Sequence, residues 1–172
     1  MGMAQTPQQI IDEGPMHWRQ GMAVVLTIPL NALDGFDVLS ISFAAPGIAT
    51  EWRIPKDVLG WVLSMELIGM AAGSILLGGV ADKIGRRPMI LACLCVMAMG
   101  MYMVTTAQNV TQLSLWRVLT GIGIGGMLPA INAVVAEFSS RKWKNLTLAL
   151  MVIGYPLGAF FGGLIARNLL GD

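Results

Sequence analysis

Two long apolar runs of the chain are separated by Gly78-Gly79-Val80-Ala81-Asp82-Lys83-Ile84-Gly85-Arg86-Arg87-Pro88. Only 12% of the 172 residues are charged, yet this short stretch contains Asp82, Lys83, Arg86 and Arg87. Because such a charge cluster cannot lie in lipid, the stretch predicts an aqueous turn between two membrane-spanning helices. Gly85 suits a tight turn, since glycine adopts left-handed conformations, and Pro88 suits the first turn of the next helix.

The composition indicates a membrane protein. Hydrophobic residues make up 55% of the chain, and the mean hydropathy is +0.69. A soluble domain of this size needs many more charges to cover its surface. The net charge is only +1 and no basic patch with interleaved aromatic residues occurs, so nothing indicates a nucleic-acid partner.

Five apolar segments are each close to the roughly 20 residues that a helix needs to span the hydrocarbon of a bilayer. They cover residues 21–46, 58–81, 88–107, 112–136 and 144–168. The predicted fold class is therefore all-α, a polytopic protein with five transmembrane helices in a lipid bilayer. Residues 1–19 are polar and are predicted to form a cytoplasmic tail, and residues 20–172 the helical bundle.

The distribution of Lys and Arg predicts the orientation. With the N-terminus inside, seven Lys and Arg residues fall on the cytoplasmic side and three on the outer side. Loops rich in these residues stay in the cytoplasm. The pattern favours a multi-pass protein of the inner (plasma) membrane whose N-terminus and 82–88 turn are cytoplasmic.

Four ionisable residues fall inside the apolar segments, namely Asp34, Asp37, Glu66 and Arg117. A charge in lipid is costly, so these side chains should face the bundle interior and be paired. A rise of about 1.5 Å per residue places Asp37, Glu66 and Arg117 in one layer of the outer half of the membrane. Asp34 lies one turn deeper, on the same helix face as Asp37.

These residues allow two interpretations. Two neighbouring acids repel each other, which favours a proton on one of them near neutral pH, and the planar fork of Arg117 binds carboxylates with two hydrogen bonds. The four residues would then form a substrate and proton-coupling site. The alternative is a buried ion pair with a purely structural role.

Two stripes of small residues predict close helix packing. Glycines four residues apart on one helix face allow two backbones to approach. One stripe follows Arg117 and contains Gly121 and Gly125, and the other contains Gly154, Gly158 and Gly162. Each stripe by itself is a common packing device.

Nothing in the sequence predicts an enzyme. His17 is the single histidine, and Cys93 and Cys95 are two residues apart, so on a helix they point to different faces. We therefore expect no catalytic residues, no metal site and no cofactor.

The pattern G-x-x-x-D-[KR]-x-G-[RK]-[RK] in residues 78–87 resembles the loop between helices 2 and 3 of major facilitator superfamily transporters. The R-x-x-x-G-x-x-x-G pattern from Arg117 resembles the helix 4 motif of this superfamily. The Gly154–Gly163 stretch is similar to its helix 5 motif, although Pro156 precedes the second glycine, whereas in the antiporter form the proline follows it.

The resemblance implies a conformational gate on the cytoplasmic side. An acid at the end of helix 4 pairs with the arginines of the 2–3 loop in this superfamily, which implies a contact of Glu137 with Arg86 or Arg87. Asp82 would hold helix 2 against its neighbours. The expected gating set is Gly78, Asp82, Gly85, Arg86, Arg87, Glu137 and Arg141.

The stretch Asp34-Gly35-Phe36-Asp37, together with the pattern from Arg117, resembles the aromatic acid:proton symporters, which include the 4-hydroxybenzoate transporters. The resemblance implies secondary active transport, with the proton gradient as the driving force. The substrate would be a small aromatic or other organic carboxylate, with proton coupling at Asp34 and Asp37 and the anion near Arg117. Glu66 is not part of the pattern that carries this resemblance.

A half of such a transporter has six helices, and transport needs both halves. The five predicted helices therefore favour a truncated N-terminal half whose partner is a missing C-terminal half. The alternatives are a sugar, metabolite or drug carrier of the same superfamily and a non-transporting membrane scaffold subunit.

Overall fold

The computed structural model describes residues 17–170, and no strand occurs among them. Each helix in this range is long and apolar enough to cross a membrane, which confirms the prediction of an all-α, polytopic fold with five spans. Of the predicted tail at residues 1–19, residues 1–16 lie outside the described residues. The helices are α2 (Trp18–Glu51), α3 (Lys56–Ile84), α4 (Arg86–Thr105), α5 (Val110–Phe138) and α6 (Lys144–Leu170).

Several helices extend beyond the apolar segments. The segment predicted to end at residue 46 continues as helix to Glu51, because helical hydrogen bonds continue where the apolar pattern has already stopped. Local signals set the other ends. The side chain of Asn109 accepts a hydrogen bond from the backbone N–H of Gln112 and so caps α5.

The turn between α3 and α4 is shorter than predicted. The charged stretch is helical up to Ile84 and again from Arg86, so Gly85 alone separates the two helices. Gly85 has φ +102° and ψ 152°, a backbone conformation that is open essentially only to glycine. The prediction of a turn over the whole charged stretch was wrong, because one glycine in this conformation is enough to reverse the chain.

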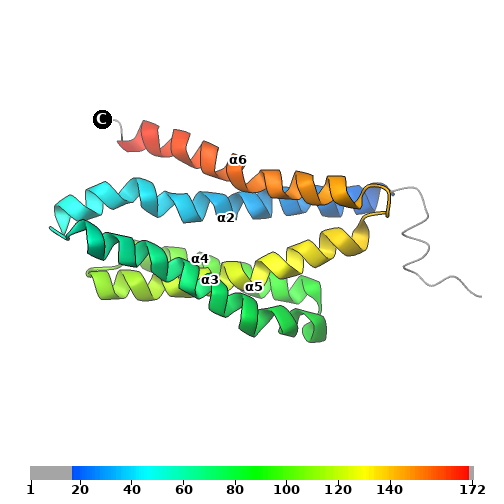
Figure 1. The fold of residues 1–172 in the computed structure, drawn as a ribbon, viewed down its shortest axis with the longest axis horizontal. Coiled ribbons are helices and arrows are strands. Elements are labelled where there is room, and N and C mark those ends of the chain that lie inside the picture. The colour runs from blue at the N-terminus through cyan, green and yellow to red at the C-terminus, as the bar shows by residue number, and fades with distance from the viewer. Residues whose placement is uncertain (1–16, 171–172) are drawn as a thin grey trace, which may run out of the picture.

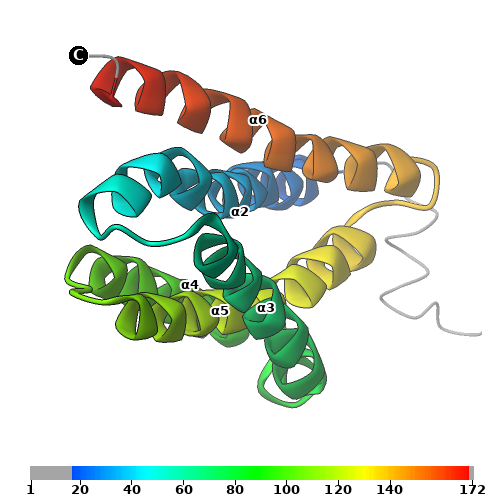
Figure 2. The same cartoon turned by 60° about the vertical axis from the view of Figure 1, so that its left-hand side comes forward.

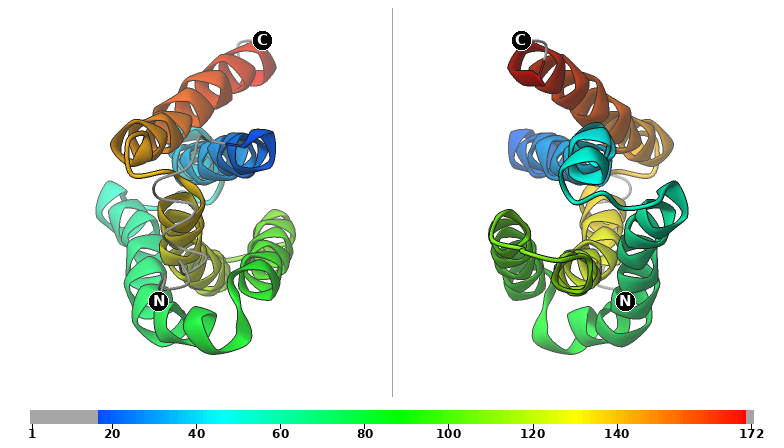
Figure 3. Two further views of the ribbon diagram at one scale, coloured as in Figure 1. Left: turned by 90° about the vertical axis from the view of Figure 1, so that its right-hand side faces the viewer. Right: turned by 90° about the vertical axis from the view of Figure 1, so that its left-hand side faces the viewer.

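Successive helices run in opposite directions and form two groups (Figures 1 and 2). In the first group α2 packs along α6, and in the second α5 lies between α3 and α4 (Figure 3). Smaller contacts of α2 with α5 and α3 join the two groups. The first half of α2 and the second half of α5 share the main core, where Val24 lies in one cluster with Ile131 and Val135.

The core is centred on α5. Its buried apolar residues pack with Cys93 and Met97 of α4 and with Val24 of α2. Large apolar side chains on the outward faces are exposed instead, as expected for surfaces in contact with lipid. Those outward residues include Leu26, Ile75, Leu76, Leu91, Phe160 and Phe161.

Candidate functional site

The predicted glycine stripes lie at the two most extensive helix contacts, that of α5 with α3 and that of α6 with α2. On α5, Gly121 lies against the carbonyl oxygen of Glu66 and Gly125 against that of Met70, both on α3. A Cβ atom at either glycine would overlap these backbone atoms. The contact sets the distance between α5 and α3 and so brings Arg117 and Glu66, on the facing sides of these helices, within reach of each other.

The contact of α6 with α2 follows the same principle. Gly154 and Gly158 lie against the carbonyl oxygens of Ile28 and Ala32, and Gly162 lies against the ring of Phe36. Sequence reasoning missed Gly69 and Gly73 of α3, whose Cβ positions would overlap the backbone of α5. Their four-residue spacing within an apolar run is the signal that could have found them.

Arg117 links three helices through buried side chains. Its Nη1 donates to Oδ1 of Asp37 on α2 at 3.4 Å, and its Nη2 donates to Oε2 of Glu66 on α3. Asp37, Glu66 and Arg117 are at most 2% exposed. The structure therefore brings together the three residues that the sequence places in one layer, and Arg117 sits at the junction of α2, α3 and α5.

Asp34 is also buried, with 1% of its surface exposed, but neither of its carboxylate oxygens has a hydrogen-bond partner within the described part of the chain. One oxygen of Asp37, one of Glu66 and the Nε of Arg117 are also without partners there. With all four side chains ionised, three negative charges and one positive charge would leave a net charge of −2 in the interior. Such a cluster is costly to bury unless it binds protons or a cation.

Asp34 belongs to a polar stripe on α2 that sequence reasoning recognised only in part. Thr27, Asn31, Asp34 and Asp37 are all buried, and their spacing of three or four residues puts them on one helix face. Asn31 donates a hydrogen bond to the carbonyl oxygen of Met151 on α6 at 2.9 Å. Polar residues recurring at helical spacing in an apolar segment were the signal for Thr27 and Asn31.

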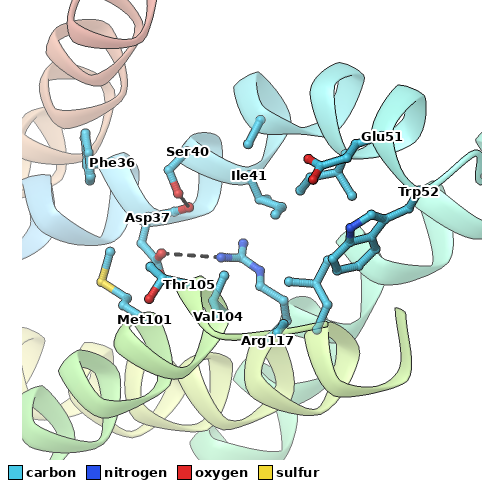
Figure 4. Close-up of a pocket in the computed structure, with 14 residues that line it drawn as sticks. Phe36, Asp37, Ser40, Ile41, Glu51, Trp52, Met101, Val104, Thr105 and Arg117 are labelled. Carbon is cyan, nitrogen blue, oxygen red and sulfur yellow. Dashed lines mark hydrogen bonds and ion pairs between the residues drawn. The ribbon is translucent and has the colours of Figure 1, made fainter. Parts of the chain in front are cut away.

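An open cavity of about 490 Å³ lies beside this cluster, lined by α2, α4 and α5. Asp37 and Arg117 contribute to its wall, with Ser40 nearby and Trp52 toward the end where α2 meets α3 (Figure 4). Its volume lies in the range of small-molecule sites. Glu66 and Asp34 are not among its lining residues, so a ligand that enters this cavity would first meet Asp37 and Arg117, with Glu66 behind Arg117.

A second charge cluster lies at the opposite end of the helices. Arg86 pairs with Asp82 of α3 at 2.6 Å and with Glu137 of α5 at 2.9 Å. Arg86 therefore connects the start of α4 to the ends of α3 and α5. Gly78 faces the ring of Pro129, whereas Arg87 and Arg141 are exposed and make no ion pair with any described residue.

Comparison with known sequences identifies the family. Residues 27–171 match the sequence model of the Major Facilitator Superfamily. The chain belongs to the Major Facilitator Superfamily. It is accordingly a multi-pass membrane protein, and the matched range includes residues of all five helices α2 to α6.

Several relatives of this facilitator chain are named as transporters of aromatic acids. It is 31% identical to the benzoate transport protein of Acinetobacter baylyi, with 91% of this chain and 36% of that protein covered. It is 32% identical to the 4-hydroxybenzoate transporter PcaK of Pseudomonas putida, with 99% of this chain and 38% of that protein covered. The chain is also 30% identical to synaptic vesicle glycoprotein 2C of Rattus norvegicus, with 98% of this chain and 23% of that protein covered. The chain thus spans less than two fifths of the length of these relatives.

Proposed function

We propose that the chain forms part of a secondary active transporter that takes up small aromatic carboxylates together with protons. The relatives named for benzoate and 4-hydroxybenzoate support this substrate class. The protein would act as a transporter and not as an enzyme, with the proton gradient as its driving force and no cofactor. The Lys and Arg distribution supports a place in the inner membrane with the N-terminus in the cytoplasm.

The observation that carries the proposal is the position of Arg117 at the wall of the cavity beside Asp37. A guanidinium group is always charged and presents N–H groups in a fixed fork, which fits the two oxygens of a carboxylate. In a water-poor interior this pairing is stronger than at a surface. Arg117 is therefore the group that would hold the carboxylate of the substrate.

Asp34 supports the coupling to protons. An unpaired carboxylate that is buried in protein is expensive, and binding a proton removes the charge. An incoming substrate anion adds a further negative charge to a cluster with three acids and one arginine. A proton that enters with the anion compensates for this charge, so anion and proton would move together, with Asp34 and Asp37 as the acids that accept it.

The transport cycle requires movement of one half of the protein against the other around the bound substrate. The C-terminal half of the transporter would be the partner of this chain. The pairs of Arg86 with Asp82 and Glu137 would stabilise one conformation and break in another. A neutral sugar would leave Arg117 at the cavity wall without a carboxylate to bind, and a membrane scaffold needs no cavity of this kind.

The experiment uses the full-length protein that contains this chain, reconstituted into proteoliposomes. An imposed pH gradient, alkaline inside, should drive labelled 4-hydroxybenzoate to a higher concentration inside than outside. A protonophore should abolish this accumulation. Uptake of a neutral sugar in place of the carboxylate, or equal accumulation with and without the pH gradient, would contradict the proposal.

A further inference from the structure

Glu66 is the one buried acid of α3 among the described residues. It is 2% exposed, while the other acids of α3, Asp57 and Asp82, are exposed. Its Oε2 accepts a hydrogen bond from Nη2 of Arg117, and its Oε1 has no partner among the described residues. Under the proposed function Arg117 binds the carboxylate of the substrate. In the structure Arg117 is already paired with a carboxylate of the protein itself, that of Glu66.

The geometry of the guanidinium group defines what Glu66 occupies. Nε and Nη2 lie on the same edge of the group, and a carboxylate can accept one hydrogen bond from each of them. Here Nη2 is bound by Glu66, and Nε has no partner within residues 17–170. Asp37 lies at Nη1, away from this edge. Glu66 therefore binds Nη2, one of the two nitrogens of the edge on which a second carboxylate could bind with two hydrogen bonds.

We propose that Glu66 is a resident counter-ion of Arg117, which the carboxylate of the substrate displaces once Glu66 has taken up a proton. The inference rests on the proposed function and adds the step that makes anion binding depend on protons. The proton that Asp34 and Asp37 accept is passed on to Glu66, so one anion and one proton enter the cluster together and its net charge stays the same. Substrate without a proton would have to compete with the charged carboxylate of Glu66.

The neighbouring acids cannot replace Glu66 in this role. Arg117 of α5 is the charged group that contacts Glu66, and Asp37 of α2 is bound to the same arginine. Asp34 lies one turn from Asp37 on α2 and is also buried. Protonation of Asp37 would release Nη1 only, and Asp34 has no hydrogen bond to Arg117. No side chain of α4 or α6 is hydrogen-bonded to any of these four residues within the described chain. Of these acids, only Glu66 can free Nη2 by its release.

The contact of α3 with α5 limits how Glu66 can move. Its carbonyl oxygen is held against Gly121, where no side chain separates the two backbones. A shift of α3 away from α5 would break this contact and that of Met70 with Gly125. The carboxylate therefore leaves Arg117 by rotation of its own side chain, while the two helices stay in place.

The test measures the Kd of 4-hydroxybenzoate for the purified full-length protein from weakly acid to weakly alkaline pH. In the wild type, affinity should fall as pH rises. Glu66→Gln and Glu66→Met remove the competing charge, so at weakly alkaline pH they should bind roughly tenfold more tightly or better. Their Kd should also depend little on pH. Asp57→Asn removes an exposed acid of the same helix and should behave as the wild type does.

Two results separate the failure of this inference from the failure of the proposed function. If the wild type binds the carboxylate and the Glu66 variants bind it equally or less tightly, with the wild-type pH dependence, Glu66 is not a displaced counter-ion. If the wild type binds no aromatic carboxylate at any pH, the proposed function is wrong and this inference falls with it.

A measurement on the wild type keeps the inference testable even if both Glu66 variants fail to fold. Binding is carried out in weakly buffered detergent solution with a pH indicator. Addition of 4-hydroxybenzoate should cause uptake of about one proton per bound anion at weakly alkaline pH, since proton binding and anion binding are linked. Binding of the anion with no uptake of protons would overturn the inference.

Discussion

Gly121 on α5 lies directly against the carbonyl oxygen of Glu66 on α3, one helical turn after Arg117. The same short segment therefore supplies the charged group of the candidate site and the small residue that lets the two helices approach. Packing and electrostatics depend on each other here, because Arg117 can reach Glu66 only while the backbones are in contact. Substitution of the glycine should consequently affect both stability and binding.

We expect Gly121→Ala to lower the free energy of unfolding by roughly 1–3 kcal/mol, the usual penalty for forcing a methyl group into a packed contact. The measurement is denaturant unfolding of the purified protein in detergent. Gly79→Ala is the matched control, since a Cβ atom at Gly79 meets no other atom within 4 Å. Equal stability of the two variants would show that the contact of α5 with α3 is not as close as described.

The charge distribution makes a prediction about topology. In a background without Cys93 and Cys95, a cysteine at Lys83 should react with a membrane-impermeant thiol reagent only when the cytoplasmic side is accessible. A cysteine at Gln108, which is exposed between α4 and α5, should react in intact cells. Labelling of position 83 from outside intact cells would reverse the orientation.

The cluster at Arg86 should act on movement rather than on substrate binding. Arg86→Ala breaks the pairs with Asp82 and Glu137, which are partly exposed to solvent and contribute little to stability. We expect a lower rate of uptake with an unchanged Kd for the carboxylate, and Lys83→Ala serves as the control for the loss of a nearby positive charge. A large increase in Kd with an unchanged rate of uptake would argue against a gating role.

Asp34 should be needed for coupling. Asp34→Asn keeps the size of the side chain and removes the carboxylate, whose two oxygens have no described partner. We expect binding of 4-hydroxybenzoate to persist and accumulation against a gradient to be lost, as measured by binding and by uptake into proteoliposomes. Accumulation at the wild-type level would remove Asp34 from the proton pathway.

The fold was predictable because hydropathy and helix length report directly on a membrane environment. Five apolar segments gave five helices, and the spacing of Gly121 and Gly125 gave a stripe that the structure places at a helix contact. The end of α2 at Glu51 and the one-residue turn at Gly85 were not predictable in this way. They depend on local hydrogen bonds and on the conformation of a single residue.

The residues of the candidate site could be predicted from the sequence, but which of them form ion pairs could not. The cost of charge in lipid singles out Asp34, Asp37, Glu66 and Arg117, and helix rise puts three of them at one depth. Which acid meets Arg117 depends on how α2, α3 and α5 are rotated and how closely they pack. In the structure Arg117 forms ion pairs with Asp37 and Glu66, and the carboxylate of Asp34 has no hydrogen-bond partner in the described chain.

Arg117 should be needed for the binding of carboxylates in particular. Arg117→Lys replaces a planar fork by a point charge, so the Kd for aromatic carboxylates should rise roughly tenfold or more. A neutral analogue that lacks the carboxylate provides the comparison, since its affinity should not change. Equal changes for the acid and the neutral analogue would indicate a general loss of packing.

The central claim is that Asp37 and Arg117 serve anion binding and proton coupling and are not merely a buried ion pair. The most direct measurement is the accumulation of labelled 4-hydroxybenzoate, driven by a pH gradient, in proteoliposomes that contain the triple variant Asp37→Asn, Glu66→Gln and Arg117→Gln, which removes Arg117 together with both of its partners. Replacing all members of a structural ion cluster can be nearly neutral, so a structural role predicts wild-type accumulation. We predict that the triple variant folds and accumulates no more substrate than vesicles without protein, and accumulation at the wild-type level would contradict the account.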